Sequence, residues 1–337
     1  MIFTDEVEEV EQLLELFSPL NIKNLRSPNR IVLPPMTNRA ADEKGHVTQQ
    51  IVDHYVARAS VGLIIVESSY INRSGCKTDH HLGIYDDDCL PGLAKLAQAI
   101  HEAGTVCGIQ INHFGSSCKR EITGEQPVGP SAVSHPKDGG LPRELTCPEI
   151  PKLVEDFVLA ARRAKRAGFD MVEIHGANGY LLNQFLSPFT NRRHDEYGGP
   201  LANRLRFALE VLHAVRQEVG SAYPIFYRLG PDDDMEGGLT LEEGARAAVL
   251  LAEAGVDVLD LSGGLKGSRA KSGEGYYIYL AEKIKPLVKV PVLVTGGVTI
   301  PNTAEKIISD GIADIVGIGR ALLANANWVV EAGKILQ

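Results

Sequence analysis

A histidine and an asparagine lie three residues apart, at His175 and Asn178, just after the short apolar run MVEI, and Tyr180 follows two residues later. Three kinds of chemistry use a histidine in such a place. It can bind a metal, activate a nucleophile, or donate a hydrogen bond to an oxygen that gains negative charge. The neighbouring residues help to decide between them.

A catalytic zinc takes about three His, Cys or carboxylate ligands, and asparagine is a poor one. A nucleophile would need a serine or cysteine within reach. Ser262 could serve, but no G-x-S-x-G motif frames any serine of the chain. Histidine and asparagine share hydrogen-bond donation, which favours a pair of donors on a carbonyl oxygen that becomes enolate-like. The phenol of Tyr180 would then be a proton source. A purely structural histidine that satisfies a core carbonyl stays open as the alternative.

Polar or glycine residues mark the ends of other apolar runs as well. They are Pro35, Met36, Thr37, Ser68, Gln110, His113, Arg228, Ser262, Gly263, Gly264, Gly296, Gly297, Gly319 and Arg320. Packing alone does not require a polar group at nearly every such position. The pattern therefore predicts a binding site where these ends meet.

The sequences VTGGV and GIGRAL place Gly296, Gly297 and Gly319 where backbone N–H groups can approach a ligand, with Arg320 beside them. Two such turns next to each other favour a phosphate site over simple tight turns. Gln110 could pair with the edge of a planar heteroaromatic ring, since its carboxamide both donates and accepts.

Arg228 could stabilise negative charge on such a ring. The alternatives are a buried amide for Gln110 and an ion pair with Glu67 or Asp260 for Arg228. Together with the phosphate site, the pattern favours flavin mononucleotide (FMN).

The elements that must position these residues form a repeat of short apolar runs and helical patterns. The runs span 31–36, 62–68, 106–112, 171–175, 225–229, 258–262, 292–296 and 315–319. Each is continuous rather than alternating, which is typical of parallel strands buried on both faces. Eight such units predict an α/β protein with one (β/α)8 TIM barrel over residues 1–337. A doubly wound sheet is the less favoured alternative.

Three segments depart from the repeat. Residues 1–30, with an acidic helical stretch at 7–17, are expected to cap the barrel bottom or to pack against a partner, so a homo-oligomer stays open. Residues 113–148 are too long and too rich in Gly and Pro for a simple connection, and predict a small excursion after the third strand. Residues 263–276 are expected to form a flexible loop after the sixth. Of the other polar clusters, 192–199 is interpreted as a salt-bridged turn and 79–81 as loop surface.

Composition excludes several classes of protein. A net charge of −9 over 337 residues argues against nucleic-acid binding, which needs a basic face. No run reaches the ~18 apolar residues of a membrane span, and the acidic start is unlike a signal peptide, so we expect a cytoplasmic protein. The five cysteines form no C-x-x-C pair, which indicates scattered reduced thiols and no metal site.

From about Leu16 to Trp328 the chain resembles the old yellow enzyme family of flavin-dependent ene-reductases. The resemblance is carried by LFSPLNIKNLRSPNRIVLPPMT, GLIIVESSYI, GIQINHFG, EIHGANGYLLNQFLSPFTNRRHDEYGG, VTGGV and GIGRAL. It implies a tightly bound FMN, with NADPH or NADH as reductant, in a single FMN-binding TIM-barrel domain.

The resemblance also implies roles for the residues along the flavin. Pro35, Met36 and Thr37 would lie along the ring, Ser68 would stand near its reactive edge, and Gln110 would pair with its pyrimidine edge. Many bacterial relatives carry cysteine in place of Thr37, and this difference would shift the flavin potential.

At the other end of the cofactor, Arg228 would face the part of the ring that becomes anionic on reduction. Gly296, Gly297, Gly319 and Arg320 would hold the phosphate. These assignments follow from the resemblance together with the positions of the residues at the strand ends.

His175 and Asn178 would bind the carbonyl or nitro oxygen of the substrate, and Tyr180 would protonate its α-carbon. The implied reaction has two half-reactions. A nicotinamide gives hydride to the flavin, and flavin N5 then gives hydride to the β-carbon of an α,β-unsaturated compound. Two other functions stay open: a phosphate-binding barrel enzyme without flavin, with Lys266 or Lys271 as a Schiff-base candidate, and a non-catalytic flavoprotein that passes electrons.

Overall fold

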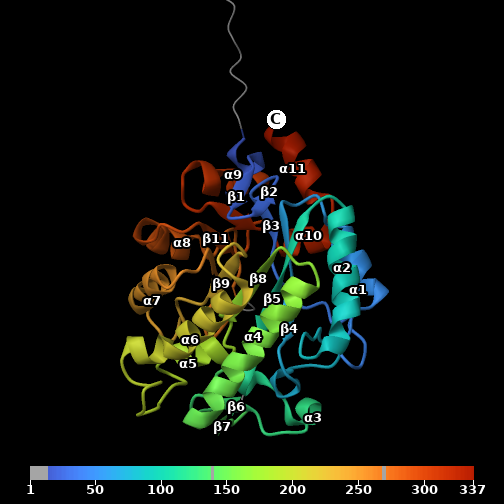
Figure 1. The fold of residues 1–337 in the computed structure, drawn as a ribbon. Coiled ribbons are helices and arrows are strands. Elements are labelled where there is room, and N and C mark those ends of the chain that lie inside the picture. Colours follow the sequence, from blue (N-terminus) through green and yellow to red (C-terminus); the bar gives the residue numbers. More distant parts are fainter. Residues whose placement is uncertain (1–13, 138–139, 268–270) are drawn as a thin grey trace, which may run out of the picture.

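The computed structural model describes residues 14–137, 140–267 and 271–337. Eight parallel strands close into a barrel in the order β10-β11-β12-β3-β4-β5-β8-β9 (Figure 1). The strands are β3 (Ile31–Leu33), β4 (Leu63–Tyr70), β5 (Val106–Asn112), β8 (Met171–Gly176), β9 (Ile225–Leu229), β10 (Val258–Leu261), β11 (Val292–Thr295) and β12 (Ile315–Gly317). Each lies on one of the eight predicted runs. The (β/α)8 prediction is confirmed, and closure of the sheet excludes the doubly wound alternative.

Helices surround the barrel (Figure 1). The α-helices are α1 (Gln49–Val56), α2 (Leu90–Glu102), α3 (Arg120–Thr123), α4 (Ile150–Arg166), α5 (Leu181–Leu186), α6 (Leu201–Val219), α7 (Leu241–Glu253), α8 (Ile278–Ile284), α9 (Pro301–Ser309), α10 (Arg320–Ala324) and α11 (Trp328–Leu336). Two of them begin at a side-chain cap. The Thr48 side chain accepts a hydrogen bond from the Ile51 N–H at the start of α1, and Thr240 does the same for Glu243 in α7. Among the described residues, no helix is long and apolar enough to cross a membrane.

Short 3-10 helices lie at η1 (Glu15–Phe17), η2 (Arg73–Gly75), η3 (Asp87–Cys89), η4 (Gly115–Ser117), η5 (Cys147–Glu149) and η6 (Lys285–Leu287). Between β5 and α4 the chain forms the predicted excursion, which carries η4, α3 and the pair β6 (Val128–Gly129) and β7 (Arg143–Glu144). All five cysteines are free thiols, as expected.

The hairpin β1 (Leu20–Ile22) and β2 (Leu25–Ser27) lies at the opposite end of the barrel from the excursion (Figure 1). Ile22 and Leu25 of this hairpin pack on an apolar layer inside the N-terminal end of the barrel. That layer consists of Val32, Leu63, Ile65, Met171, Phe226, Val258, Leu293 and Ile315. Of the acidic stretch expected at 7–17, residues 7–13 lie outside the described residues.

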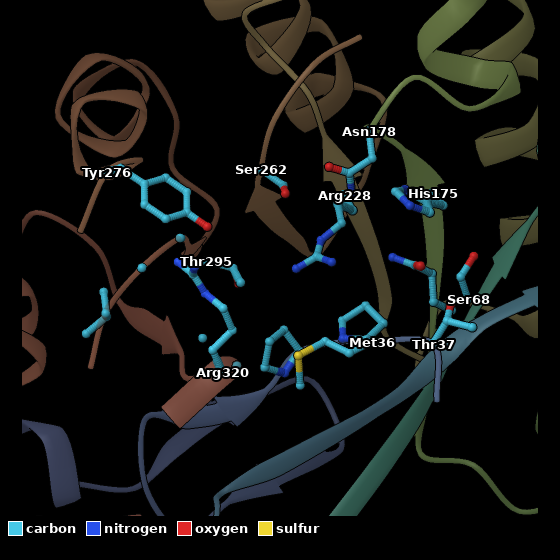
Figure 2. Close-up of a pocket in the computed structure, with 18 of the residues that line it drawn as sticks. Met36, Thr37, Ser68, His175, Asn178, Arg228, Ser262, Tyr276, Thr295 and Arg320 are labelled. Atoms are coloured by element: carbon cyan, nitrogen blue, oxygen red, sulfur yellow. The ribbon is translucent and has the colours of Figure 1, made fainter. Parts of the chain in front are cut away.

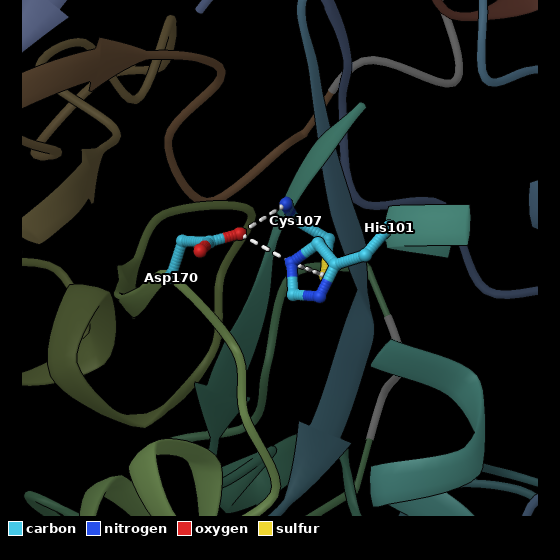
Figure 3. A group of neighbouring side chains, drawn as sticks. All are labelled: His101, Cys107 and Asp170. Carbon is cyan, nitrogen blue, oxygen red and sulfur yellow. Dashed lines mark hydrogen bonds and ion pairs between the residues drawn. The ribbon is translucent and has the colours of Figure 1, made fainter. Parts of the chain in front are cut away.

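A carboxylate ties neighbouring strands together at the same end. Asp170 stands just before β8, and its Oδ2 accepts hydrogen bonds from the Cys107 backbone N–H at 2.8 Å and from His101 Nε2 at 2.7 Å (Figure 3). In return, the Asp170 N–H donates to the Cys107 carbonyl at 2.8 Å. The side chain therefore extends the β5–β8 ladder by one hydrogen bond.

The same arrangement recurs at two further strand pairs. Asp257 bonds the Ile225 N–H at 2.7 Å and pairs with Lys23 at 2.7 Å and with Arg216. At the third pair Asp314 bonds the Val292 N–H at 2.7 Å and pairs with Lys285 at 2.6 Å. A charged acceptor is stronger than a neutral one, so these aspartates hold the barrel closed below the site.

We predict that Asp257→Ala lowers the free energy of unfolding by about 3 kcal/mol, because it leaves the Ile225 N–H without its acceptor and the Arg216 guanidinium without its carboxylate partner. Urea denaturation measures this change. Asp310→Ala is the matched control: it removes an exposed pair with Lys306 on α9 and should cost less than about 0.5 kcal/mol. Equal losses in the two variants would contradict the role given to Asp257.

Candidate active site

A cavity of about 440 Å³ opens at the C-terminal ends of the barrel strands. Every candidate catalytic and cofactor-binding residue proposed from the sequence lines it. These residues are Pro35, Met36, Thr37, Ser68, Gln110, His175, Asn178, Tyr180, Arg228, Gly296, Gly297, Gly319 and Arg320. Closure of the barrel thus brings residues that follow the first and the last barrel strands of the chain into one site. The volume of the cavity is that of a cofactor or substrate pocket.

His175 and Asn178 lie on one side of this cavity, with Tyr276 and Arg320 on the other (Figure 2). His175 ends β8 and is buried. Asn178 follows in the left-handed region, with φ of 57°, which asparagine tolerates better than most residues. Its backbone N–H donates to the Gly263 carbonyl at 2.7 Å. This turn directs both side chains toward the same part of the cavity.

The protonation state of His175 follows from its contacts. Its Nδ1 accepts a hydrogen bond from the Ala177 N–H at 3.3 Å, so the proton of the neutral ring lies on Nε2. Burial lowers the pKa of His175 well below its ordinary value, and the positive charges of Arg228 and Lys137 lower it further. His175 is therefore a neutral hydrogen-bond donor.

Tyr180 packs edge-on against His175, with ring centroids 5.1 Å apart, and against Phe114 at 4.5 Å. The excursion supports this segment, because His135 Nε2 donates to the Gly179 carbonyl at 2.9 Å. Gln184 Nε2 donates to the same carbonyl at 2.7 Å. The donors and the phenol thus sit on a turn that is held from both sides.

Thr37 lies beside a histidine that the sequence did not suggest. His81 Nε2 donates to the Ser68 carbonyl at 2.7 Å and lies 3.4 Å from Thr37 Oγ1. Since a carbonyl cannot donate, the proton is on Nε2, and Thr37 is left to donate elsewhere. Burial lowers the pKa of His81 to about 4. The interpretation of 79–81 as loop surface holds for exposed Asp79 and His80 but is wrong for His81, which is buried.

The middle of the barrel holds a layer of polar side chains beneath the cavity. Arg228 Nε pairs with Asp260 at 2.6 Å, and Gln110 Nε2 donates to Glu173 at 2.7 Å. The ion pair with Asp260 was the structural alternative for Arg228, and it coexists with a place in the cavity wall. Glu67 does not take part in this ion pair.

Sequence patterns alone assign no role to Glu173 and make Asp260 only a possible partner of Arg228. A signal was present, because a charged residue interrupts each of the apolar runs MVEIH and VLDLS. Lys137 and Tyr276 also line the cavity but were missed. They lie in loops, where no periodicity marks them. His113, by contrast, is buried outside the described lining.

Glycines shape the end of the cavity near β11 and β12. Gly297 has φ of 77°, and a Cβ there would lie 2.4 Å from the Tyr276 ring and 2.6 Å from the Gly273 carbonyl. A Cβ on Gly319 would lie 3.1 Å from Met36 Sδ. The Arg320 guanidinium lies 5.5 Å from the centroid of the Tyr276 ring. Only glycine fits at position 297, which keeps the backbone open to a ligand.

The charge and the unsatisfied groups of the cavity indicate what it binds. Its described lining includes Lys137, Arg228 and Arg320 but no carboxylate, although the chain is acidic overall. Ser68 Oγ and Arg228 Nη2 are buried and have no hydrogen-bond partner among the described residues. Such groups cost free energy unless a ligand satisfies them. A planar ring with polar edges and an anionic tail meets these conditions.

The predicted salt-bridged turn at 192–199 is confirmed and anchors the excursion. Arg193 pairs with Asp195 at 2.5 Å, and its Nη1 donates to the carbonyls of Pro130 and Leu145 at 3.0 and 2.5 Å. Of the loop expected at 263–276, residues 268–270 lie outside the described residues. Its remaining part includes Tyr276 in the cavity wall.

Comparison with known proteins adds independent information. The model of the NADH:flavin oxidoreductase / NADH oxidase family matches residues 15–337. NADH oxidase of Thermoanaerobacter brockii is 45% identical over 327 residues, which cover 94% of this chain but only 50% of that protein. NADPH dehydrogenase of Clostridium acetobutylicum is 39% identical over 326 residues, covering 96% of this chain and 95% of that protein.

Solved structures agree with this result. The old yellow enzyme homologue from Zymomonas mobilis is 31% identical, with a TM-score of 0.85 over 96% of this chain and 93% of that one. Morphinone reductase in complex with tetrahydroNAD is 33% identical, with a TM-score of 0.82 over 94% of this chain and 91% of that one.

The buried neutral histidines predict a pH effect on stability. Burial lowers the pKa of His113 to about 4, whereas an unfolded histidine titrates near about 6.5. Below pH 6.5 His113 binds a proton in the unfolded chain but stays neutral in the folded chain. It therefore lowers the free energy of unfolding as the pH falls toward 4. We expect His113→Gln to reduce that fall by on the order of 2 kcal/mol between pH 6.5 and 5, measured by urea denaturation at each pH. Parallel pH dependences in the variant and the parent would refute the assignment.

Proposed function

Because the chain belongs to the NADH:flavin oxidoreductase / NADH oxidase family, that of the old yellow enzymes, we propose that it is an ene-reductase. It takes hydride from NADPH or NADH and reduces the activated C=C bond of α,β-unsaturated carbonyl or nitro compounds. One observation carries the proposal: a neutral His175, with its proton on Nε2, stands beside Asn178 in the wall of the cavity.

Membership of this family implies FMN as the cofactor and NAD(P)H as the reductant. The cavity fits this group, since it offers the unsatisfied Ser68 Oγ and Arg228 Nη2, and an open glycine backbone at Gly297. In our proposal Pro35, Met36, Thr37, Ser68, Gln110 and Arg228 hold the ring, and Gly296, Gly297, Gly319 and Arg320 hold the phosphate. When bound, FMN would supply the two-electron hydride chemistry that links the nicotinamide to the substrate's β-carbon.

His175 and Asn178 bind the substrate oxygen. His175 Nε2–H and the Asn178 carboxamide donate to it, and negative charge grows on this oxygen as hydride arrives at the β-carbon. Donors that the fold already holds in place favour that charge more than water does, because they need not reorient as the charge develops. A neutral histidine suits this task, because it keeps its proton through the reaction.

Tyr180 supplies the second hydrogen of the product. Its phenol O–H gives a proton to the α-carbon, and solvent returns the proton to the phenolate. The ring contacts with His175 and Phe114 hold Tyr180 beside the bound oxygen. Substrate thus lies between the pair of donors and the proton source.

We predict that His175→Ala and Asn178→Ala each slow the oxidation of reduced enzyme by cyclohexenone about 100-fold, the usual effect of losing one such donor. Dithionite is used to reduce the enzyme anaerobically, so that nicotinamide binding does not enter the measurement. Recovery of flavin absorbance in a stopped-flow instrument gives the rate. His194→Ala, an exposed histidine on the neighbouring turn, is the control and should leave the rate unchanged. Rates within threefold of the parent in both site variants would sink the proposal.

Tyr180→Phe should separate proton transfer from hydride transfer. An enone needs the proton to complete its reduction, and loss of the donor should slow its turnover about 100-fold. Hydride addition to a nitroalkene gives a nitronate, which is stable as an anion, so flavin reoxidation by a nitroalkene should change little. Equal losses with both substrates would argue against Tyr180 as the proton donor.

A further inference from the structure

The polar layer beneath the cavity contains two carboxyl groups and one guanidinium, all buried. Glu173 and Asp260 are 0% exposed and Arg228 is 4% exposed. Strand register places Gln110 opposite Glu173 and Arg228 opposite Asp260. The mechanism above uses Gln110 and Arg228 but assigns nothing to the two acids behind them.

The two acids have different partners. Asp260 Oδ2 accepts from Arg228 Nε at 2.6 Å, and Asp260 Oδ1 accepts from Thr295 Oγ1 at 3.3 Å. Glu173 Oε1 accepts from the neutral Gln110 amide at 2.7 Å, and no N–H or hydroxyl group of the described residues donates to Glu173 Oε2. A buried unpaired charge is costly, and the layer holds one cation. One carboxylate balances it, and the other acid must stay neutral.

Geometry decides which acid is neutral. Asp260 contacts the guanidinium directly, whereas Glu173 contacts the Gln110 amide and the Asp260 carboxyl group, so that one proton lies between the two acids. Burial raises the pKa of Asp260 as well, but the contact with Arg228 opposes that rise. Burial raises the pKa of Glu173 well above its ordinary value, and the Asp260 carboxylate raises it further against the opposing effect of Arg228. His175, two residues along β8, is itself neutral. Tyr277, which raises the pKa of Arg228, keeps its own proton because burial raises its pKa.

We propose that Glu173 and Asp260 are positioning residues for the FMN ring and together carry one negative charge opposite Arg228, with Asp260 ionised and Glu173 a neutral acid. Asp260 holds Arg228 by Nε and leaves Nη2 for the ring. Glu173 engages Gln110 Nε2, which leaves the Gln110 carbonyl to accept from a ring N–H. The inference rests on the proposed place of the ring against Gln110 and Arg228.

The charge balance has a consequence for the reduction potential. Reduction adds negative charge to the ring beside Arg228, whose own charge is offset by Asp260. Replacing a neutral Glu173 by glutamine changes no charge, and glutamine keeps an acceptor for Gln110. Removing the one carboxylate leaves Arg228 uncompensated, which favours the reduced ring.

The test is the midpoint potential of bound FMN, from anaerobic titration with reference dyes at pH 7. Glu173→Gln should match the parent. The double variant Glu173→Gln/Asp260→Asn should shift the oxidised–reduced equilibrium toward the reduced form at least tenfold, which is about 30 mV for two electrons. The double variant is needed because Glu173 could ionise and replace Asp260 in the single Asp260→Asn variant.

Two results would overturn the inference. A Glu173→Gln potential clearly above that of the parent at pH 7, with the gap closing at lower pH, would mean that Glu173 is ionised. An unchanged potential in the double variant would mean that the pair does not balance Arg228 near the ring. Glu210→Gln is the control: Glu210 is a half-buried acid of α6 bonded to Tyr197, and its substitution should leave the potential unchanged.

An infrared measurement keeps the inference testable if the double variant does not fold. The parent should show a protonated carboxyl C=O band at neutral pH that Glu173→Gln lacks and Glu210→Gln retains. No difference between the parent and Glu173→Gln would refute the neutral acid. Neither measurement uses an enone, so an absence of ene-reductase activity would count against the proposed function alone.

Discussion

The ion pair between Arg228 and Asp260 is the interaction on which the site depends. A barrel interior is normally filled with apolar side chains, and here the N-terminal layer is apolar. One layer higher, the same strands place a cation, two acids and an amide in the core. Such a layer is tolerable only if its charges are paired and its hydrogen bonds are made. Those contacts fix the side chains that form the floor of the cavity.

Closure of the barrel does the rest of the positioning. Parallel strands all end at one rim, so Thr37 near the start of the chain and Arg320 near its end meet in one cavity. Aspartates at the N-terminal ends of the strands bind neighbouring strands together. The residues at the C-terminal rim are therefore free to form the site. The excursion after β5 then returns to the site through His135, which supports the turn that carries Asn178 and Tyr180. Stability and chemistry are thereby separated along the barrel axis.

Much of this could be predicted from the sequence, because strands buried on both faces leave long apolar runs and the residue after each run must lie at the rim. That reasoning placed His175, Gln110 and Arg228 near the rim, and all three line the cavity. No role was predicted for Glu173, although the alternation of side chains along a strand puts it on the same face as His175. The reason is that its role depends on Arg228 and Asp260, which come from other strands. His81 was missed for the same reason. His81 is buried against Thr37 and Ser68, and the residues next to it in the sequence do not indicate that burial.

We propose that one cavity takes hydride from a nicotinamide and passes it to an activated alkene. An anaerobic absorbance titration tests it most directly. The purified protein should be yellow, NADPH or NADH should bleach its flavin absorbance, and cyclohexenone added afterwards should restore the absorbance with one equivalent of saturated ketone formed. A flavin that is bleached but not restored by cyclohexenone or by any unsaturated carbonyl or nitro compound would contradict this function.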